Sequence, residues 1–254
     1  MTVRLIVAGR LPTGWERQHT AAAAETSTSY GSRVDIDDYF EVQAVIADPR
    51  FVPPPPAPAG EPGTMTWLRA LVARFSGGET HARRRALVEA ELARIDPDTL
   101  RAKAATESTV ERPYIPVAVL ARELGITDVE NAVAAVREVA AAYQGGYNTP
   151  PDAAVATLVG MLEPADPEVT ANRIGILVQA CDATASMISR PAASPVQFTR
   201  RQALVDVEIG GRTIPAGTVV QLRISSFPFG GDARPCPGRA HAVALAQGVT
   251  RGSR

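Results

Sequence analysis

The stretch FGGDARPCPG, residues 229–238, is a loop rich in glycine and proline that leads into the alanine-rich segment 239–246. Proline is favoured at the first position of a helix, so Pro237 predicts a helix that begins directly after Cys236. The dipole and the unpaired N–H groups of a helix N-terminus stabilise a thiolate, so we expect a lowered pKa for the Cys236 thiol. Most free cysteines are inert and buried, but a thiolate in such a loop is suited to bind a metal ion.

The segments before this loop differ in their periodicity. Residues 202–224 are β-branched and contain Gly-Gly and Pro-Ala-Gly turns, which predicts a small hairpin sheet. Residues 52–63 are so rich in proline and glycine that we expect a loop, a candidate lid. Residues 1–33 show no sustained period and are expected to be weakly structured. Helical patterns occur within 34–48 and over 66–75, 79–95, 114–124, 128–142, 152–163, 171–189 and 239–246. The expected fold is mainly α with a small antiparallel β-sheet, in a single domain over residues 1–254.

Composition excludes several classes of protein. The 254 residues include 26 basic and 27 acidic side chains, so no global charge favours nucleic acid or an anionic membrane. The two cysteines, Cys181 and Cys236, exclude a disulfide framework and suit a reducing compartment. No apolar run approaches the length of about 18 residues that spans a bilayer, and the apolar run near the start is too short for a signal peptide. We expect a cytoplasmic protein that binds neither nucleic acid nor membrane.

The cysteine loop resembles the haem-thiolate signature of the cytochrome P450 family, F-x-x-G-x-R-x-C-x-G. Phe229, Arg234, Cys236 and Gly238 occupy the expected offsets, while Asp232 stands where the pattern has glycine, so the neighbouring glycines are expected to supply the turn. Four other segments resemble bacterial members of the family, in the family's order: VDIDDYFEVQAVIADPRF, GETHARRRALVEAEL, GILVQACDATASMI and FTRRQALVDVEIGGRTIPAGTVV. The resemblance covers residues from about 34 to the end and implies a compact or truncated P450-like fold.

The resemblance also implies a cofactor, haem b (iron protoporphyrin IX), with Cys236 as the axial ligand of the iron. A thiolate ligand donates electron density to iron and favours O–O cleavage. Arginine and histidine side chains would bind the two propionates as charge-assisted partners, and Phe229 would pack against the porphyrin. The implied cofactor-binding residues are His81, Arg85, Arg201, Phe229, Arg234 and Gly238.

Each of these matches also has an ordinary structural interpretation. The run Arg83–Arg85 is typical of a solvated helix face, and a histidine such as His81 near a helix start is often a surface residue. His241 lies in the final helix and is expected to pack there, while Cys181 in an apolar helix is expected to be a buried small residue.

The segment that resembles the family's oxygen-binding helix departs from its A-G-x-[DE]-T motif. The acid is present as Asp182, but Ala183 replaces the neighbouring alcohol, and Thr184 follows one residue later, about 100° further round a helix. In the family this acid and alcohol deliver protons to bound dioxygen. The candidate catalytic positions are therefore Asp182, Ala183 and Thr184, with the relay left to Thr184, water or substrate.

Two further elements of the family are missing. The E-x-x-R motif of its K helix is absent, since too few residues separate the oxygen-binding segment from FTRR, and Glu91-Leu-Ala-Arg94 is expected to be a surface pair in an earlier helix. The irregular meander before the cysteine loop is missing too. In the family the missing elements form a scaffold that helps to dock a ferredoxin, so the sequence does not decide whether a ferredoxin and its reductase are the redox partner. A second subunit, in a homodimer, is a candidate to cover the region that the missing elements would leave exposed.

Three functions follow from the resemblance. The first is P450-like oxidation, most simply hydroxylation, of a small secondary-metabolite substrate with O2 or peroxide. The second is a peroxygenase, or a haem-dependent rearrangement or bond-forming enzyme, that needs no redox partner. The third is a non-catalytic haem-binding protein, such as a sensor.

Overall fold

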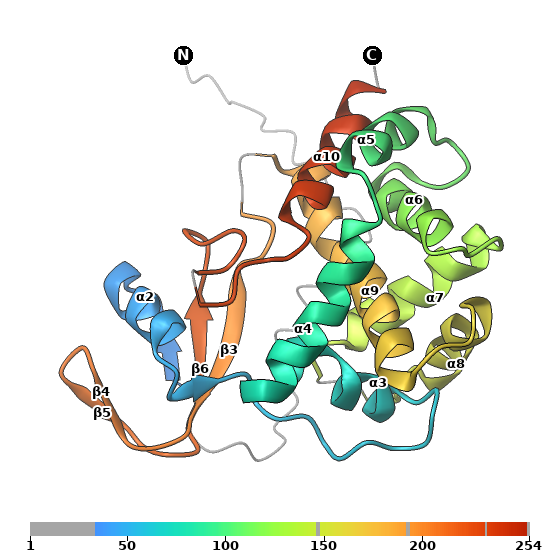
Figure 1. Cartoon of the computed structure of the whole chain (residues 1–254). Coiled ribbons are helices and arrows are strands. Elements are labelled where there is room, and N and C mark those ends of the chain that lie inside the picture. Colours follow the sequence, from blue (N-terminus) through green and yellow to red (C-terminus); the bar gives the residue numbers. More distant parts are fainter. Residues whose placement is uncertain (1–33, 146–147, 192–193, 232, 253–254) are drawn as a thin grey trace, which may run out of the picture. The chain divides into compact units, whose positions relative to one another are not determined.

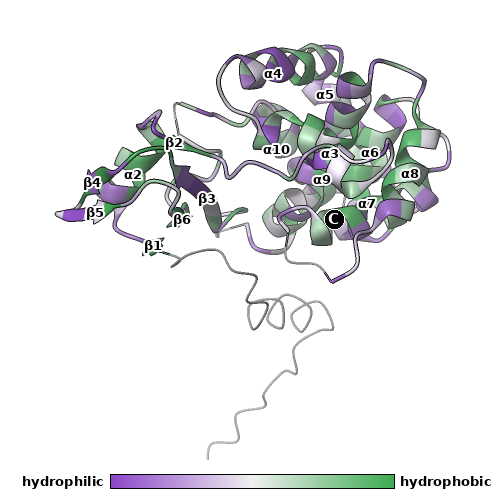
Figure 2. Cartoon of the chain, turned by 90° about the horizontal axis from the view of Figure 1, so that it is seen from below, coloured by the Kyte–Doolittle hydropathy of each residue, from purple (hydrophilic) through white to green (hydrophobic). Residues whose placement is uncertain are grey.

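The computed structural model describes residues 34–145, 148–191, 194–231 and 233–252. The prediction that residues 1–33 are weakly structured, and the role of Asp232 in the loop, lie outside these residues. The described chain forms a group of helices and a sheet that carries one helix, with a hydrophobic core in each (Figure 1). Figure 2 shows the same two groups from below, with the strands and α2 on one side of the molecule and the remaining helices on the other.

Helix α9 (Pro167–Ser189) runs through the middle of the helical group and is contacted by most of its other helices. Its start is fixed by Asp166, whose carboxylate accepts the Glu168 N–H at 2.8 Å, and by Pro167 in the first turn. The surrounding helices are α3 (Met65–Leu71), η1 (Ala73–Phe75), α4 (Gly78–Ala93), η2 (Arg112–Tyr114), α6 (Ile115–Glu123), α7 (Val129–Ala142) and α8 (Asp152–Met161).

The helix that follows the cysteine loop packs against another helix at one end of this group. Helix α10 (Arg239–Arg251) packs along α5 (Pro97–Thr106) more extensively than any other pair of described elements. The close approach requires glycine, because a Cβ on Gly248 would lie 2.3 Å from the carbonyl oxygen of Arg101. The sequence patterns missed α5 and ended α10 at residue 246, five residues early.

The strands form one sheet in the order β1-β6-β3-β2 and a separate hairpin. Strand β3 (Phe198–Ala203) pairs antiparallel with β6 (Val219–Arg223) and with β2 (Phe51–Val52), and β4 (Val207–Ile209) pairs with β5 (Arg212–Ile214). Strand β1 (Val34–Ile36) pairs with β6 in parallel, so this sheet is mixed, while its other strand pairs are antiparallel as the sequence predicts. Helix α2 (Tyr39–Ala47) contributes Val42 and Val45 to the core of this group. The hairpin and helix α2 match the sequence prediction, whereas three-residue β1 gave no periodic signal.

The proline-rich stretch links the two groups. Residues 53–64 connect β2 to α3 without helix or strand, as the sequence predicts for 52–63. The other connections between the groups are residues 190–197, from α9 to β3, and residues 224–238, from β6 to α10. Within the described part of the chain, no helix has the length and apolar character needed to cross a membrane.

Candidate cofactor site

Backbone hydrogen bonds among the described residues fold the cysteine loop, residues 224–238. The N–H of Phe227 donates to the carbonyl of Ile224 at 2.8 Å, that of Gly230 donates to Phe227 at 3.0 Å, and that of Cys236 donates to Phe229 at 2.7 Å. Gly230 has a φ of +81°, and a Cβ there would lie 2.6 Å from the carbonyl oxygen of Arg234. Gly230 therefore supplies the turn, as expected from the sequence.

Cys236 projects from this loop as an exposed free thiol. The helix begins at Arg239 with Gly238 as its N-cap, so the prediction that Pro237 is the first helical residue is wrong. The predicted fall in the pKa is also wrong: burial against protein atoms raises the pKa of the Cys236 thiol more than the Gly238 N–H and Arg85 lower it. Because its pKa is raised, the Cys236 thiol of the free protein is protonated at neutral pH.

Helix α4 brings two of the expected residues to the cysteine loop. The Arg85 guanidinium donates from Nη1 to the carbonyl oxygen of Pro235 at 2.6 Å and pairs through Nε with Glu89 at 2.6 Å. His81 lies one turn earlier on the same helix face. Burial, followed by the charges of Arg234, Arg85 and Arg201, lowers the pKa of His81, so these cations lie within electrostatic range of the imidazole.

Strand β3 and the loop contribute two further arginines. Arg201 is only 7% exposed and donates from Nη1 to the Thr199 hydroxyl at 3.0 Å and to the carbonyl oxygen of Arg200 at 2.8 Å. Burial, then the charges of Arg74 and Arg234, lowers the pKa of Arg201 to about 9. Arg234 donates from Nη1 to the carbonyl oxygen of Ser76 at 3.0 Å.

Arg74, in η1, is a member of this group that the sequence did not indicate. Its Nη2 donates to the Thr199 hydroxyl at 3.3 Å, and burial is the main cause that lowers the pKa of the guanidinium. It also lowers the pKa values of Arg201 and Arg234, which places it among them. We refer to Arg74, Arg85, Arg201 and Arg234 with His81 as the cation cluster.

Arg85 is the member of the cation cluster that has a compensating acid, Glu89, whereas the other three arginines lack one among the described residues. Across residues 34–145, 148–191, 194–231 and 233–252, Arg74, Arg201 and Arg234 form no ion pair. Buried guanidinium groups without a carboxylate are costly unless an anion binds to them. A porphyrin with two propionates fits this requirement, because the cation cluster adjoins a loop that presents an accessible cysteine thiol.

Helix α9 separates the three positions of the expected proton relay. Asp182 is exposed and Ala183 is half-buried. Thr184 is fully buried and its hydroxyl donates to the carbonyl oxygen of Ala180 at 2.7 Å, a local bond within the helix. Thr184 therefore does not share the exposed side of α9 with Asp182, because two residues further along the helix its side chain lies in the core.

Similarity to known structures was found at the level of the fold alone. No protein-family model and no curated protein sequence matches the chain. Among solved structures, the thermophilic cytochrome P450 from Sulfolobus tokodaii matches with a TM-score of 0.67 at 15% identity, over 94% of this chain and 90% of that chain. Epothilone B-bound cytochrome P450epoK matches with a TM-score of 0.67 at 18% identity, over 86% and 82%. P450BioI in complex with acyl carrier protein ligated to hexadec-9Z-enoic acid matches with a TM-score of 0.64 at 14% identity, over 86% and 83%.

The chain has a shortened cytochrome P450 fold. The P450 K helix is missing, as the sequence predicts: residues 190–197 join α9 directly to β3, and the described part of this connection contains no helix. The letters E-x-x-R at Glu91 and Arg94 lie in α4, where they form an i,i+3 pair at 3.7 Å. Cys181 is 1% exposed, and burial raises the pKa of its thiol to about 12, as suits a structural cysteine of the P450 core.

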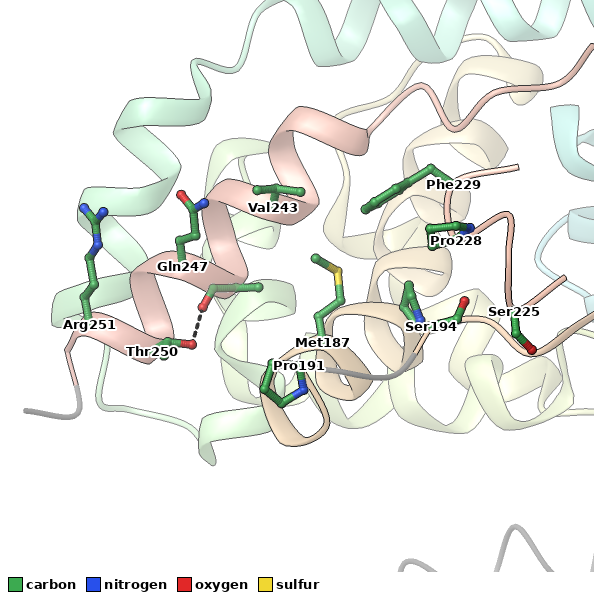
Figure 3. Close-up of a pocket in the computed structure, with 12 residues that line it drawn as sticks. Met187, Pro191, Ser194, Ser225, Pro228, Phe229, Val243, Gln247, Thr250 and Arg251 are labelled. Carbon is green, nitrogen blue, oxygen red and sulfur yellow. Dashed lines mark hydrogen bonds between the residues drawn. The ribbon is translucent and has the colours of Figure 1, made fainter. Parts of the chain in front are cut away.

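A pocket of about 640 Å³ lies beside the short α9–β3 connection of this P450 fold (Figure 3). Phe229 forms part of its wall, with Met187 of α9 and Val243 of α10, and the Arg239 guanidinium stacks over the Phe229 ring at 5.1 Å. Phe229 therefore has one face toward this pocket. Contact of its ring with a porphyrin stays a prediction.

Three participants in the site were missed by the sequence analysis. Arg74 follows an apolar helix pattern and stands beside Phe75, so nothing in its context distinguishes it. Thr199 lies inside a stretch that resembles the family, two residues before Arg201, and that spacing on a strand places both side chains on one face. Ser76 contributes a backbone carbonyl, which no side-chain pattern reveals.

Proposed function

We propose that this protein binds haem through Cys236 and the cation cluster and catalyses P450-type oxidation of a small molecule. The observation that carries the proposal is the convergence of four arginines, three of them without an ion pair among the described residues, on the loop that presents Cys236. The similarity to P450 folds supports the proposal, and the four arginines come from η1, α4, β3 and the segment before α10.

The residues of the chain would divide the work of holding the cofactor. Cys236 would bind the iron. Arg85 would fix the position of Cys236, because its guanidinium donates a hydrogen bond to the carbonyl oxygen of the preceding residue, Pro235. Arg201, Arg234 and His81 would bind the propionates, whose negative charges would relieve the repulsion within the cation cluster. Gly238 would support the thiolate through its N–H.

Haem bound through a thiolate supplies the activation of O2 or peroxide. In hydroxylation with O2, one oxygen atom would enter the substrate C–H bond and the other would leave as water, with two electrons from a redox partner and two protons from solvent. With hydrogen peroxide the same products form without added electrons. Asp182 is the exposed acid on α9 that can exchange protons with solvent, while Ala183 contributes no hydroxyl.

The absorption spectrum of the haem-reconstituted protein, reduced and exposed to CO, tests haem binding and ligation together. We expect the red-shifted Soret band of a thiolate-ligated haem, and its loss in Cys236→Ala. Cys181→Ala is the matched control, because the Cys181 thiol is buried in the core and should leave the band unchanged. A Cys236→Ala variant with an unchanged haem spectrum would overturn the proposal.

The second candidate is a peroxygenase, or a haem-dependent rearrangement or bond-forming enzyme, that needs no ferredoxin. The specific observation in its favour is that Thr184 is buried and its hydroxyl donates to the Ala180 carbonyl, so the alcohol nearest to Asp182 in the sequence is engaged within the helix. Turnover with peroxide or with substrate alone, compared with turnover with ferredoxin, reductase and NAD(P)H, separates the two candidates. Ala183→Thr should increase coupling of electrons to product only if the O2 reaction operates.

Stoichiometric haem without reactivity toward O2 or peroxide would favour the third function, a haem sensor. The oligomeric state bears on the shortened scaffold. We propose that a second subunit in a homodimer covers the region beside residues 190–197, and light scattering of the haem-loaded protein tests this.

A further inference from the structure

The Thr199 hydroxyl holds two guanidinium groups side by side. Its oxygen accepts Nη1–H of Arg201 at 3.0 Å and Nη2–H of Arg74 at 3.3 Å. A hydroxyl oxygen has two lone pairs, so both are now engaged. The hydroxyl proton is left to donate, and within the described ranges it has no acceptor.

This arrangement joins residues far apart in the sequence. Arg74 comes from η1, while Thr199 and Arg201 are two positions apart on β3 and lie on the same face of the strand. Thr199 is 8% exposed and Arg201 is 7% exposed, so water screens the two charges poorly. Neither Arg74 nor Arg201 has an ion-pair partner in the part of the chain that the structure describes. Two guanidinium groups and one hydroxyl proton therefore offer three donor groups to a single anion.

We propose that Arg74, Thr199 and Arg201 form a clamp for one carboxylate of the porphyrin, in which Thr199 positions the two arginines and donates its own proton. The clamp rests on the proposed function, because it assigns the ligand of that same site. Arg234, Arg85 and His81 remain for the second carboxylate. Arg74 thereby becomes a cofactor-binding residue, and Thr199 a positioning residue.

The test compares porphyrins that differ in charge at this position. Binding of iron protoporphyrin IX, of its dimethyl ester and of metal-free protoporphyrin IX is measured by fluorescence quenching of the haem-free protein. We expect Arg74→Ala to weaken binding of the diacid about tenfold or more, the range for a hydrogen bond between charged groups. Its effect on the dimethyl ester should be less than about twofold, since the ester has no carboxylate to lose.

Thr199 is tested by a pair of variants. Thr199→Val keeps the shape of the side chain without the hydroxyl and should weaken diacid binding about tenfold. Thr199→Ser restores the hydroxyl and should recover most of that loss. Arg94→Ala is the control, because this arginine lies at the end of α4 with a side chain that is 73% exposed, and its affinity should match the wild-type protein.

The outcomes separate a clamp from a structural role. Loss of affinity for diacid and ester alike in Arg74→Ala would overturn the clamp. Haem-free Arg74→Ala should also melt at a higher temperature than the wild-type protein, because repulsion from Arg201 and Arg234 is removed, and a lower melting temperature would contradict the clamp. If iron and metal-free porphyrins bind equally while the Arg74 effect persists, ligation by Cys236 has failed and the clamp stands.

Discussion

Replacement of Arg201 by methionine should stabilise the haem-free protein and weaken haem binding at the same time. The side chain is buried, and its guanidinium has no carboxylate partner in the part of the chain that the structure describes. Methionine fills a similar length without a charge and adapts to irregular space. The variant therefore removes a charge that helps only when an anion is present.

The size of the effect follows from the pKa. Burial and the charges of Arg74 and Arg234 lower the pKa of Arg201 to about 9, which is about 3.5 pH units below the ordinary value for arginine. A folded-state pKa below the unfolded value means that the protonated group destabilises the fold at every pH below about 9. At 1.36 kcal/mol per unit the cost at pH 7 is about 5 kcal/mol. Loss of the hydrogen bonds to Thr199 and to the Arg200 carbonyl offsets part of it, so we expect a net gain of about 3 kcal/mol.

Urea unfolding of the haem-free protein at pH 7, followed by far-ultraviolet circular dichroism, measures this gain. With a slope of about 2–3 kcal/mol per molar urea, the midpoint should rise by about 1 M or more. Arg200→Met is the matched control, because Arg200 is exposed on the same strand, and its midpoint should stay within about 0.3 M of the wild-type value.

Haem titration of the same variants completes the experiment. Arg201→Met should bind haem at least about tenfold more weakly, because it loses a charged hydrogen bond to the ligand. A fall in the urea midpoint together with unchanged haem affinity would refute the reasoning, since Arg201 would then be a structural residue rather than a ligand for an anion.

Other substitutions probe the loop, the core and the pH dependence. Tyr143→Phe should raise the unfolding free energy by about 1 kcal/mol in a melting experiment, because the Tyr143 hydroxyl is buried without a hydrogen-bond partner among the described residues, and a loss of stability would show that it has one. Gly230→Ala should abolish haem binding in a titration, because a Cβ there meets the Arg234 carbonyl, while Gly211→Ala in the β4–β5 turn, also at positive φ, should cost stability and spare haem. His81→Gln should make the haem-free protein lose less stability than the wild-type protein as the pH falls below about 6.5, because burial and neighbouring arginines lower the His81 pKa; identical acid unfolding curves would contradict this.

The sequence predicted most of the helices because their apolar residues recur at helical spacing. Helix α9 and helix α7 bury such a stripe along their whole length, so their periodicity is plain. Helix α5 is mostly polar and has only two buried residues, Leu100 and Ala104, which is too few to produce a stripe. Strand β1 is three residues long, and its parallel pairing with β6 joins segments separated by almost the whole chain.

Site residues could be predicted where they lie at fixed spacings in one segment of the sequence. They could not be predicted where tertiary contacts bring them together. Phe229, Arg234 and Cys236 share one loop, so their spacing carried the resemblance. The direction of the Cys236 pKa shift was predicted wrongly because burial by neighbouring atoms, which raises the pKa, outweighs one N–H and one arginine, which lower it. The local sequence does not reveal that burial. Arg74 joins the cation cluster through Thr199, a contact across 125 positions.

The chain passes three times between its two hydrophobic cores, along residues 53–64, 190–197 and 224–238. Cys236 lies on the third passage, where Phe227 packs against the core of the sheet and Leu245 lies in the core of the helices. A molecule bound between α4, β3 and residues 224–238 would link the two cores to each other. Rigidity of the whole protein would then be a property of the filled site, and slowed amide exchange should spread from β3 and α4 into both cores when that site is filled.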